Sequence, residues 1–371
     1  MKITKFFALL CAAATLSVVG CETNNGTDEP DNSGGNKPGK ETIELDAKRT
    51  VTTGEEVVFT VKTASGEDVT AESKIHLKAD GSVVENPFVS EVDGKFEFYA
   101  TYGTKISKVI TVSVVPEIPT LPEDDQPENL AFNHHVLLVD HTGTDCGFCP
   151  NMMAAINEVA AMPGYHEKFY EAMAHTYNTD DPAYSHAAEI VKSHYRSLIN
   201  GYPTATFNFY HPTPARYYAD DVKSQIDALW KADGADAGVA ASVTGGNTMV
   251  VVSASVKAKV AGDYCITAWL LEDGIYAVQN GTKDERYYTH NNAVRSLAST
   301  DRIYGFSLGT IEAGQSKSYE MTMDINTNAG WKPENLKVLV IASALNKSKR
   351  YEVVNMTVCP VNQSVNYDYK K

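Results

Sequence analysis

The sequence predicts a multidomain protein in which one α/β domain lies between two β sandwiches. Two segments, 42–116 and 238–371, contain runs rich in β-branched and aromatic residues in which polar and apolar side chains alternate, which is typical of strands. Between them, residues 130–237 alternate strand-like runs with helix-period segments, which indicates an α/β layer with some parallel pairing. The chain of 371 residues is long enough for two or three domains.

The first twenty residues predict a targeting segment. Lys2 and Lys5 precede an apolar run at 6–19 that is too short for an ordinary transmembrane helix. The run ends in VVGC, and small residues before a cysteine resemble the cleavage box of bacterial lipoproteins, in which the cysteine becomes the first residue and carries the lipid, such as palmitate. We therefore expect residues 1–20 to be a lipoprotein signal peptide and Cys21 to be the lipid attachment site. The alternative is an ordinary secretory signal with an incidental cysteine.

Export would place the folded part outside the cytoplasm, where disulfides persist. The formal net charge is −15, with 47 acidic residues against 32 Lys and Arg. Phosphate backbones repel such a chain, so we expect no binding of nucleic acid.

The elements after the signal are expected in the following order. Residues 21–41 are polar, with Gly, Asn and Pro throughout, and predict a flexible tether. Residues 42–116 predict a small immunoglobulin-like sandwich, with strands at 57–62, 95–101 and 108–114. Residues 117–129 are rich in proline and acids and predict a stiff, solvated linker.

The central domain, 130–237, is expected to begin with a buried strand at 136–141, followed by a helix from Cys149 that ends before Pro163 and Gly164. The later elements are a strand at 169–177, a helix at 183–199, a strand at 204–210 and a helix at 219–232. Residues 238–371 return to strand patterns and predict a C-terminal β sandwich. The strands are expected at 249–258, 264–272, 319–324, 336–343 and 351–358, with a long insertion at 275–308.

The stretch VLLVDHTGTDCGFCP, residues 136–150, carries the chemistry. A thiol attacks disulfides as its thiolate, and the free N–H groups at a helix start favour that anion. We expect Cys146 at the helix start as the attacking thiol, and Cys149 one turn inside as the resolving thiol. Two alternatives stay open: an inert structural disulfide, and a metal site that would need His141 and His175 as further ligands.

A second motif, GYPT at 201–204, directly precedes the strand predicted at 204–210. The order of strand, CxxC helix, strand, helix and proline-led strand resembles the thioredoxin fold. In that family a cis proline faces the cysteines, and the residue before it offers its backbone to an extended substrate. The resemblance assigns these roles to Pro203 and Tyr202. Two features depart from the family: Asp145, often Trp there, should raise the pKa of the neighbouring thiol, and only one clear strand follows Pro203 where a hairpin is usual.

The whole chain resembles a narrower group, the Omp-twenty-eight-related outer-membrane lipoproteins of Bacteroidetes-type bacteria. The shared features are the lipoprotein box, the TGxxCGFCP-type turn, GYPT, an HNNAVR string at 290–295 and a WKPENL segment at 331–336. The resemblance implies a lipid-anchored protein of the outer membrane with this architecture, and it implies no particular activity.

Three further groups have both a functional and an ordinary interpretation. Cys265 and Cys359 are either a disulfide between strands or two buried small residues. Asp180 and Asp181 could bind calcium, but a solvated turn is the simpler interpretation. The polar string His290, Asn291, Asn292 and Arg295 is either a recognition surface or a capped turn.

The leading functional hypothesis is thiol–disulfide exchange on exported proteins, which needs no dissolved cofactor and no metal. The expected partners are the membrane, through the lipid on Cys21, and exported proteins that carry thiols or disulfides. The rival hypothesis is a non-enzymatic binding or assembly lipoprotein that uses the thioredoxin-like scaffold. The sequence does not indicate an oligomeric state.

Overall fold

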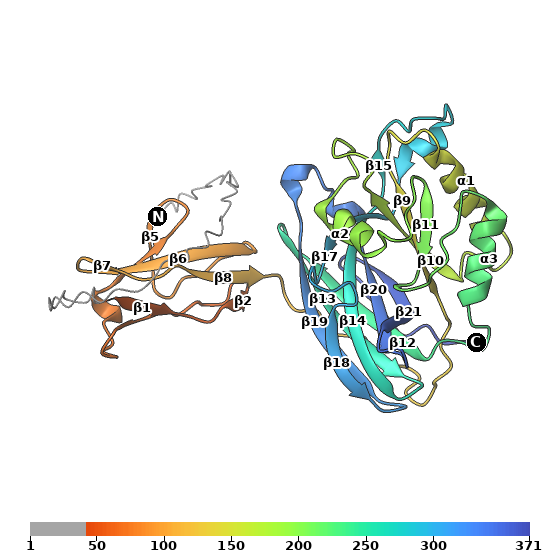
Figure 1. Ribbon diagram of the computed structural model, residues 1–371. Helices are drawn as coiled ribbons and strands as arrows, with labels where there is room; N and C mark the ends of the chain where they lie inside the picture. Colours follow the sequence, from red (N-terminus) through yellow and green to blue (C-terminus); the bar gives the residue numbers. More distant parts are fainter. Residues whose placement is uncertain (1–41) are drawn as a thin grey trace, which may run out of the picture. The chain divides into compact units, whose positions relative to one another are not determined.

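A computed structural model describes residues 42–371 (Figure 1). The predicted signal segment, the lipid site Cys21 and the tether lie outside these residues. Strands in several sheets are the main regular structure of the described residues. None of the helices in this part of the chain is long and apolar enough to cross a membrane.

The first part of the described chain is built of strands that share one core. They are β1 (Ile43–Asp46), β2 (Thr50–Thr52), β3 (Thr60–Thr63), β4 (Lys74–Leu77), β5 (Val83–Val84), β6 (Gly94–Tyr102), β7 (Lys105–Ile106) and β8 (Ile110–Val115). One sheet pairs β1 with β3, and the other has the order β2-β8-β6-β4-β5, with β7 on β6. Alternate residues of β1 are buried, and the rings of Phe59, Phe88 and Phe98 pack together. The predicted strand pattern therefore folds into sheets around an apolar centre.

The linker at 117–129 has no regular strands, as expected, but it is held to the following part of the chain. The Lys257 ammonium group donates hydrogen bonds to the Asp124 carboxylate at 2.8 Å and to the carbonyl oxygens of Gln126 and Pro127 at 3.2 and 2.6 Å. The Lys257 side chain is only 4% exposed, so its charge needs these partners. These contacts hold the linker to Lys257, while most linker residues remain exposed.

The α/β part follows the predicted order of elements. It consists of β9 (Val136–Thr142), α1 (Cys149–Ala160), β10 (Phe169–His175), α2 (His186–His194), β11 (Thr204–Phe207) and α3 (Ala219–Leu229). β9 is buried along its whole length, pairs in parallel with β10 and is antiparallel to β11. Val136 and Leu138 pack with α1 and α3, whereas Leu137 and Val139 pack with α2, so the helices cover both faces of this sheet (Figure 1).

Four of these elements are shorter than predicted: β10 ends two residues early and α3 three residues early, and α2 and β11 differ as follows. Helix α2 begins after Ser185, whose hydroxyl accepts a hydrogen bond from the Ala188 N–H group, and ends at His194 before a series of turns. Strand β11 ends at Phe207 because Asn208 has φ 44°, which turns the chain out of the sheet.

The C-terminal part forms two facing sheets around a second core. Its strands are β12 (Ala237–Gly245), β13 (Met249–Ala258), β14 (Gly262–Glu272), β15 (Ile275–Tyr276), β16 (Thr289–His290), β17 (Ala293–Leu297), β18 (Phe306–Ile311), β19 (Ser316–Asp324), β20 (Leu336–Leu345), β21 (Tyr351–Pro360) and β22 (Ser364–Val365). The smaller sheet has the order β19-β13-β12-β22, and its apolar face packs on β14, β20 and β21. Pairs such as Val252 and Ile266 lie in the core between the sheets.

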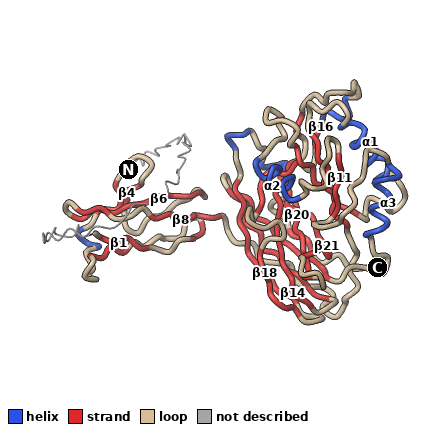
Figure 2. Tube along the Cα trace, in the orientation of Figure 1, coloured by secondary structure: helices blue, strands red, loops and turns tan. Residues whose placement is uncertain are grey.

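One large sheet crosses the boundary predicted between residues 237 and 238. Its order is β11-β9-β10-β17-β14-β20-β21, with β18 also paired to β14. The link is a short parallel contact between β10 and β17, in which Met173 pairs with Ala293 and the Met173 N–H group donates to the Asn292 carbonyl oxygen at 2.8 Å. Figure 2 draws the strands in red and labels β11, β14, β20 and β21 of this sheet. Strand β9, which leads into the CxxC turn, and the C-terminal strands therefore share one sheet.

The two cysteines of the C-terminal part are not joined. Cys265 on β14 is paired in register with Ser343, whereas Cys359 on β21 is paired with Val338. Strand β20 lies between the two cysteines, and their partners on β20, Ser343 and Val338, are five residues apart. The sulfur atoms therefore cannot meet. Both are free and buried, and burial raises the pKa of Cys359 to about 11. Of the two interpretations left open, a Cys265–Cys359 disulfide is wrong and two buried small residues is right.

Candidate redox site

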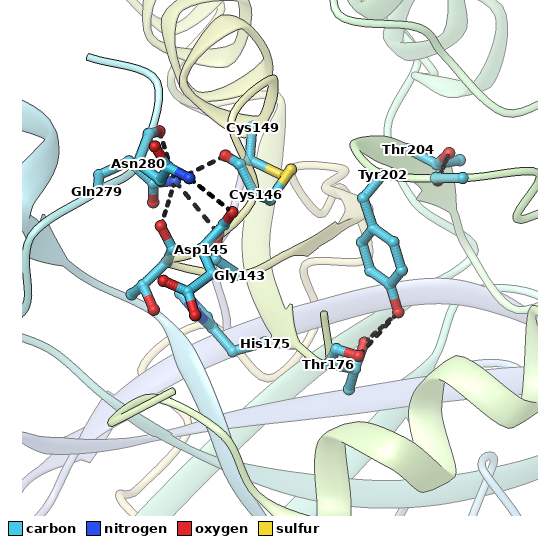
Figure 3. The surroundings of a disulfide bond; sticks show 12 residues. Gly143, Asp145, Cys146, Cys149, His175, Thr176, Tyr202, Thr204, Gln279 and Asn280 are labelled. Carbon is cyan, nitrogen blue, oxygen red and sulfur yellow. Dashed lines mark hydrogen bonds between the residues drawn. A yellow bond between two sulfur atoms is a disulfide. The ribbon is translucent and has the colours of Figure 1, made fainter. Parts of the chain in front are cut away.

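Cys146 and Cys149 form a disulfide in the turn that joins β9 to α1 (Figure 3). The S–S bond is 2.01 Å long and the Cα atoms are 5.4 Å apart. Helix α1 begins at Cys149, with Phe148 as its N-cap residue and Pro150 in the first turn, where a missing N–H group costs little. The prediction that Cys146 opens the helix is therefore wrong: Cys146 precedes it, and its carbonyl oxygen accepts a hydrogen bond from the Cys149 N–H group at 3.3 Å.

The disulfide is covered, although its turn reaches the surface. Cys146 is 2% exposed and Cys149 is completely buried, whereas Phe148 between them is 65% exposed. Asp145 is also exposed, and its carboxylate accepts a hydrogen bond from the Asn178 amide group. Of the two sulfur-bearing residues, Cys146 is the one that retains contact with solvent.

A loop from the C-terminal part covers the carbonyl side of the turn. This loop, residues 279–281, is called the strap below. The buried Gln279 amide nitrogen lies 3.2, 3.1 and 3.0 Å from the carbonyl oxygens of Gly143, Thr144 and Cys146. Asn280 donates its backbone N–H group to Thr144 O at 2.7 Å and its side-chain amide to Asp145 O at 3.1 Å.

On the amide side, the same turn is held by Asp181. Its carboxylate accepts hydrogen bonds from the Thr144 N–H group at 2.7 Å and from His175 Nδ1 at 2.8 Å. The second carboxylate oxygen accepts the Ala183 N–H group at 2.8 Å. Burial raises the pKa of Asp181, but the hydrogen bond and charge of His175 and the two backbone hydrogen bonds outweigh it and lower the pKa to about 2.

The expectation of a solvated turn therefore holds for Asp180, which is exposed, and is wrong for Asp181, which is buried. No group of three or more His, Cys, Asp or Glu residues between 42 and 371 is placed to hold a metal ion.

Tyr202 and Pro203 lie beside the disulfide. The peptide bond between them is cis, Pro203 is buried, and β11 starts at the next residue, where Thr204 pairs with His141 near the end of β9. The Tyr202 hydroxyl group lies 2.9 Å from Thr176 Oγ1 and donates to the Thr176 carbonyl oxygen at 3.0 Å. Figure 3 shows Tyr202 on one side of the disulfide and Gln279 and Asn280 on the other. The structure thus brings together the four residues that the sequence singled out.

Two buried acids lie near this end of the sheet. Asp140 is completely buried on β9, and neither carboxylate oxygen has a hydrogen-bond partner in the described residues. Burial, and then the charge of Glu171, raise the pKa of Asp140 well above its usual value. Burial also raises the pKa of Glu171 on β10 to about 7, although Asn292 donates a hydrogen bond to it at 3.2 Å. Side chains along β9 point alternately to the two faces of the sheet, so Asp140 lies on the same face as Val136 and Leu138, which α1 covers.

Sequence reasoning missed Asp140 and Gln279, and it named Asp181 only as a possible calcium ligand. A carboxylate that ends the otherwise apolar run VLLVD was a usable signal for Asp140. Gln279 and Asp181 lie in polar loops, and nothing in their local sequence indicates that they meet the cysteine turn.

The polar string at 290–295 is mostly internal, so a recognition surface formed by it is wrong. His290 is completely buried, and Arg295 is 4% exposed. Arg295 Nε donates to Glu272 at 2.7 Å, and its other nitrogen atoms donate to the carbonyl oxygens of Tyr184 and Pro182 at 3.1 and 3.0 Å. Burial lowers the pKa of Arg295 despite the Glu272 charge. These residues join β14 and β17 to the loop before α2.

Comparison with known proteins supports the fold. HBP35 of Porphyromonas gingivalis, a bacterium of the Bacteroidetes, superimposes with a TM-score of 0.53 at 19% identity, over 65% of this chain and 79% of that one. Spo0M, the sporulation control protein of Bacillus subtilis, matches 35% of this chain and 49% of its own with a TM-score of 0.22 at 19% identity, too low to carry an argument. No protein-family model and no curated protein matches the chain.

Proposed function

We propose that this protein is a membrane-anchored, extracytoplasmic thiol–disulfide exchange protein with a thioredoxin-like redox centre. The observation that carries the proposal is the Cys146–Cys149 disulfide in the turn between β9 and α1, beside the start of β11. A CxxC pair at a strand-to-helix turn is a recurring location for reactive thiols.

The topology around the disulfide supports a thioredoxin-like arrangement. Strands β9 and β10 are parallel and connected through α1, and β11 lies antiparallel on the other side of β9. The usual hairpin after the proline-led strand is reduced to one bridge, in which Ala205 and Ala215 exchange backbone hydrogen bonds of 3.2 and 2.8 Å.

The chemistry proceeds through a mixed disulfide. When the centre is reduced, the Cys146 thiolate attacks a disulfide sulfur of the partner, forms a new S–S bond and releases one partner thiolate. Cys149 then attacks Cys146 Sγ, releases the second partner thiolate and closes the Cys146–Cys149 bond. The partner gains two electrons and the protein loses two; the oxidised centre runs the same steps in reverse on a partner dithiol. Cys146 takes the outer role because Cys149 is completely buried.

Asp140 is suited to give up and regain a proton during this cycle. Its carboxyl group lies on the face of the sheet that α1 covers and has no hydrogen-bond partner in the described residues. A buried acid with a raised pKa keeps its proton to higher pH than a free acid does and can transfer it to a neighbouring group. Tyr202 and Pro203 are proposed to flank the bound partner segment.

The location is part of the proposal. The lipoprotein-type signal and Cys21 support a lipid anchor, and the resemblance to outer-membrane lipoproteins supports the outer membrane as the site. The fold shared with HBP35 of a Bacteroidetes bacterium is compatible with this assignment.

Trapping of partners tests the proposal. A Cys149→Ser variant should accumulate mixed disulfides with exported proteins in cells, because the resolving thiol is gone, and the matched Cys146→Ser variant should not. After mild reduction, iodoacetamide labelling across pH should reveal one fast thiol with a pKa clearly below the ordinary value of about 8.5. Two slow thiols and no trapped partners would refute the exchange function.

A second function, binding or assembly at the outer membrane without turnover, is favoured by one observation. Both cysteines are almost completely buried and the strap covers their turn, so a partner cannot reach the sulfur atoms without local movement. In that case the disulfide would resist reduction by glutathione in the folded protein.

A further inference from the structure

The strap meets the cysteine turn at every residue from 143 to 147. Gln279 and Asn280 together donate to the carbonyl oxygens of residues 143–146, with donor–acceptor distances between 2.7 and 3.2 Å. At Gly147 the two backbones pack so closely that only glycine fits at position 281: a Cβ atom there would lie 2.0 Å from the Gly147 carbonyl oxygen. Gly281 also has φ 85°, which other residues rarely adopt.

The strap is itself anchored in the C-terminal part. It follows β15, which pairs with β16 through Ile275 and His290. The Ala277 N–H group donates to the Tyr288 carbonyl oxygen at 2.9 Å, and His290 Nε2 lies 3.3 Å from the Ala277 carbonyl oxygen. Because the strap is anchored, movement of the cysteine turn away from it would break the hydrogen bonds between the Gln279 amide and the carbonyl oxygens of the turn. A buried amide group without partners costs free energy.

Reduction requires the turn to change. The two sulfur atoms are bonded in the disulfide and must move apart to non-bonded distance when the bond is broken. The strap on the carbonyl side and Asp181 on the amide side hold the backbone of the turn in the conformation that has the bond closed. A held turn keeps the two thiols at a high effective concentration toward each other.

We propose that the strap is a positioning element of the redox centre, and that it shifts the Cys146–Cys149 equilibrium toward the disulfide. The proposal rests on the exchange function and deepens it, because it assigns the oxidising or reducing strength of the centre to a loop more than 130 residues further along the chain. Gln279 carries most of the effect because its single amide group serves three carbonyl oxygens of the turn.

The test is the equilibrium of the full chain with mixtures of reduced and oxidised glutathione. One molecule of protein disulfide and two of reduced glutathione give the protein dithiol and one oxidised glutathione, and trapping with a maleimide counts the thiols. Gln279→Met keeps the side-chain volume and removes the donor. We expect it to lower the equilibrium constant for disulfide formation about tenfold, the size of one or two net hydrogen bonds, which corresponds to about 30 mV.

Two further variants complete the design. Asn280→Ala lies on an exposed residue and removes one hydrogen bond to the turn, so we expect a shift of about threefold in the same direction. Gln315→Ala, at an exposed glutamine distant in sequence, is the matched control and should leave the equilibrium unchanged. Thermal unfolding of each oxidised variant checks that the fold is retained.

An equilibrium constant within twofold of the unmodified chain in folded Gln279→Met overturns the proposal. If Gln279→Met does not fold, Asn280→Ala decides, and an unchanged constant in that variant overturns it. The equilibrium needs no partner protein, so it can confirm the strap even when partner trapping by Cys149→Ser fails, and the two failures are distinguishable.

Discussion

Replacing Asp140 by Asn should stabilise the protein, and the gain should grow with pH. Asp140 is completely buried, and neither of its carboxylate oxygens has a partner in the described residues. Burial and the neighbouring Glu171 charge raise its pKa in the folded state above the unfolded value. Because the folded chain then holds a proton that the unfolded chain releases, stability falls as the pH rises from about 4 to the folded pKa. Asn does not ionise, so the substitution removes this pH-dependent loss of stability.

The magnitude follows from the linkage. Each pH unit between the unfolded pKa of about 3.9 and the folded pKa contributes about 1.4 kcal/mol, so the advantage of Asp140→Asn should grow by that amount per pH unit from about pH 4 until the folded pKa is reached. The assay is urea unfolding at several pH values, followed by tryptophan fluorescence. The three tryptophans, Trp230, Trp269 and Trp331, lie in the α/β and C-terminal parts, so the signal excludes the N-terminal strands. Asp301→Asn, at an exposed position, is the control. A difference between Asp140→Asn and the unmodified chain that is the same at every pH would refute the reasoning.

Three other substitutions or measurements test the remaining parts of the site. Asp181→Ala should destabilise the protein by about 3 kcal/mol, because it leaves His175 and the Thr144 N–H group unpaired. In the unmodified chain, the part due to the lowered Asp181 pKa should be present above about pH 4 and lost as the pH falls toward about 2, which acid unfolding would reveal. Arg295→Met should cost about 3–5 kcal/mol by stranding the buried Glu272, and Arg295→Met with Glu272→Leu should recover much of it in the same unfolding assay. In thiol mapping by mass spectrometry, Cys265 and Cys359 should label only after unfolding and Cys146 and Cys149 only after reduction; labelling of Cys359 in the folded protein at neutral pH would contradict its burial and its pKa of about 11.

The elements of the α/β part were predictable because their signals are local. The apolar run before Asp140 fits a strand buried on both faces, and the spacing of Met152, Ile156 and Val159 fits one face of α1. The CxxC spacing and GYPT then located the four residues that meet at the site.

The remaining features depend on contacts between distant segments. Strand β17 lies in a polar string and pairs with β10 at a single register position, so no periodicity reveals it. The fate of Cys265 and Cys359 depends on strand order and register, which spacing in the sequence does not determine. The strap and Asp181 bind backbone N–H and C=O groups of the cysteine turn. Nearly every residue carries these groups, so the sequence of the turn does not indicate the contacts.

The parallel contact between β10 and β17 bears on whether the α/β part can be separated from the C-terminal part. A segment that ends at residue 237 would lack β17, so the Met173 N–H group would lose its acceptor and this edge of β10 would be open to another chain. We therefore expect such a segment, expressed alone, to associate through this edge strand.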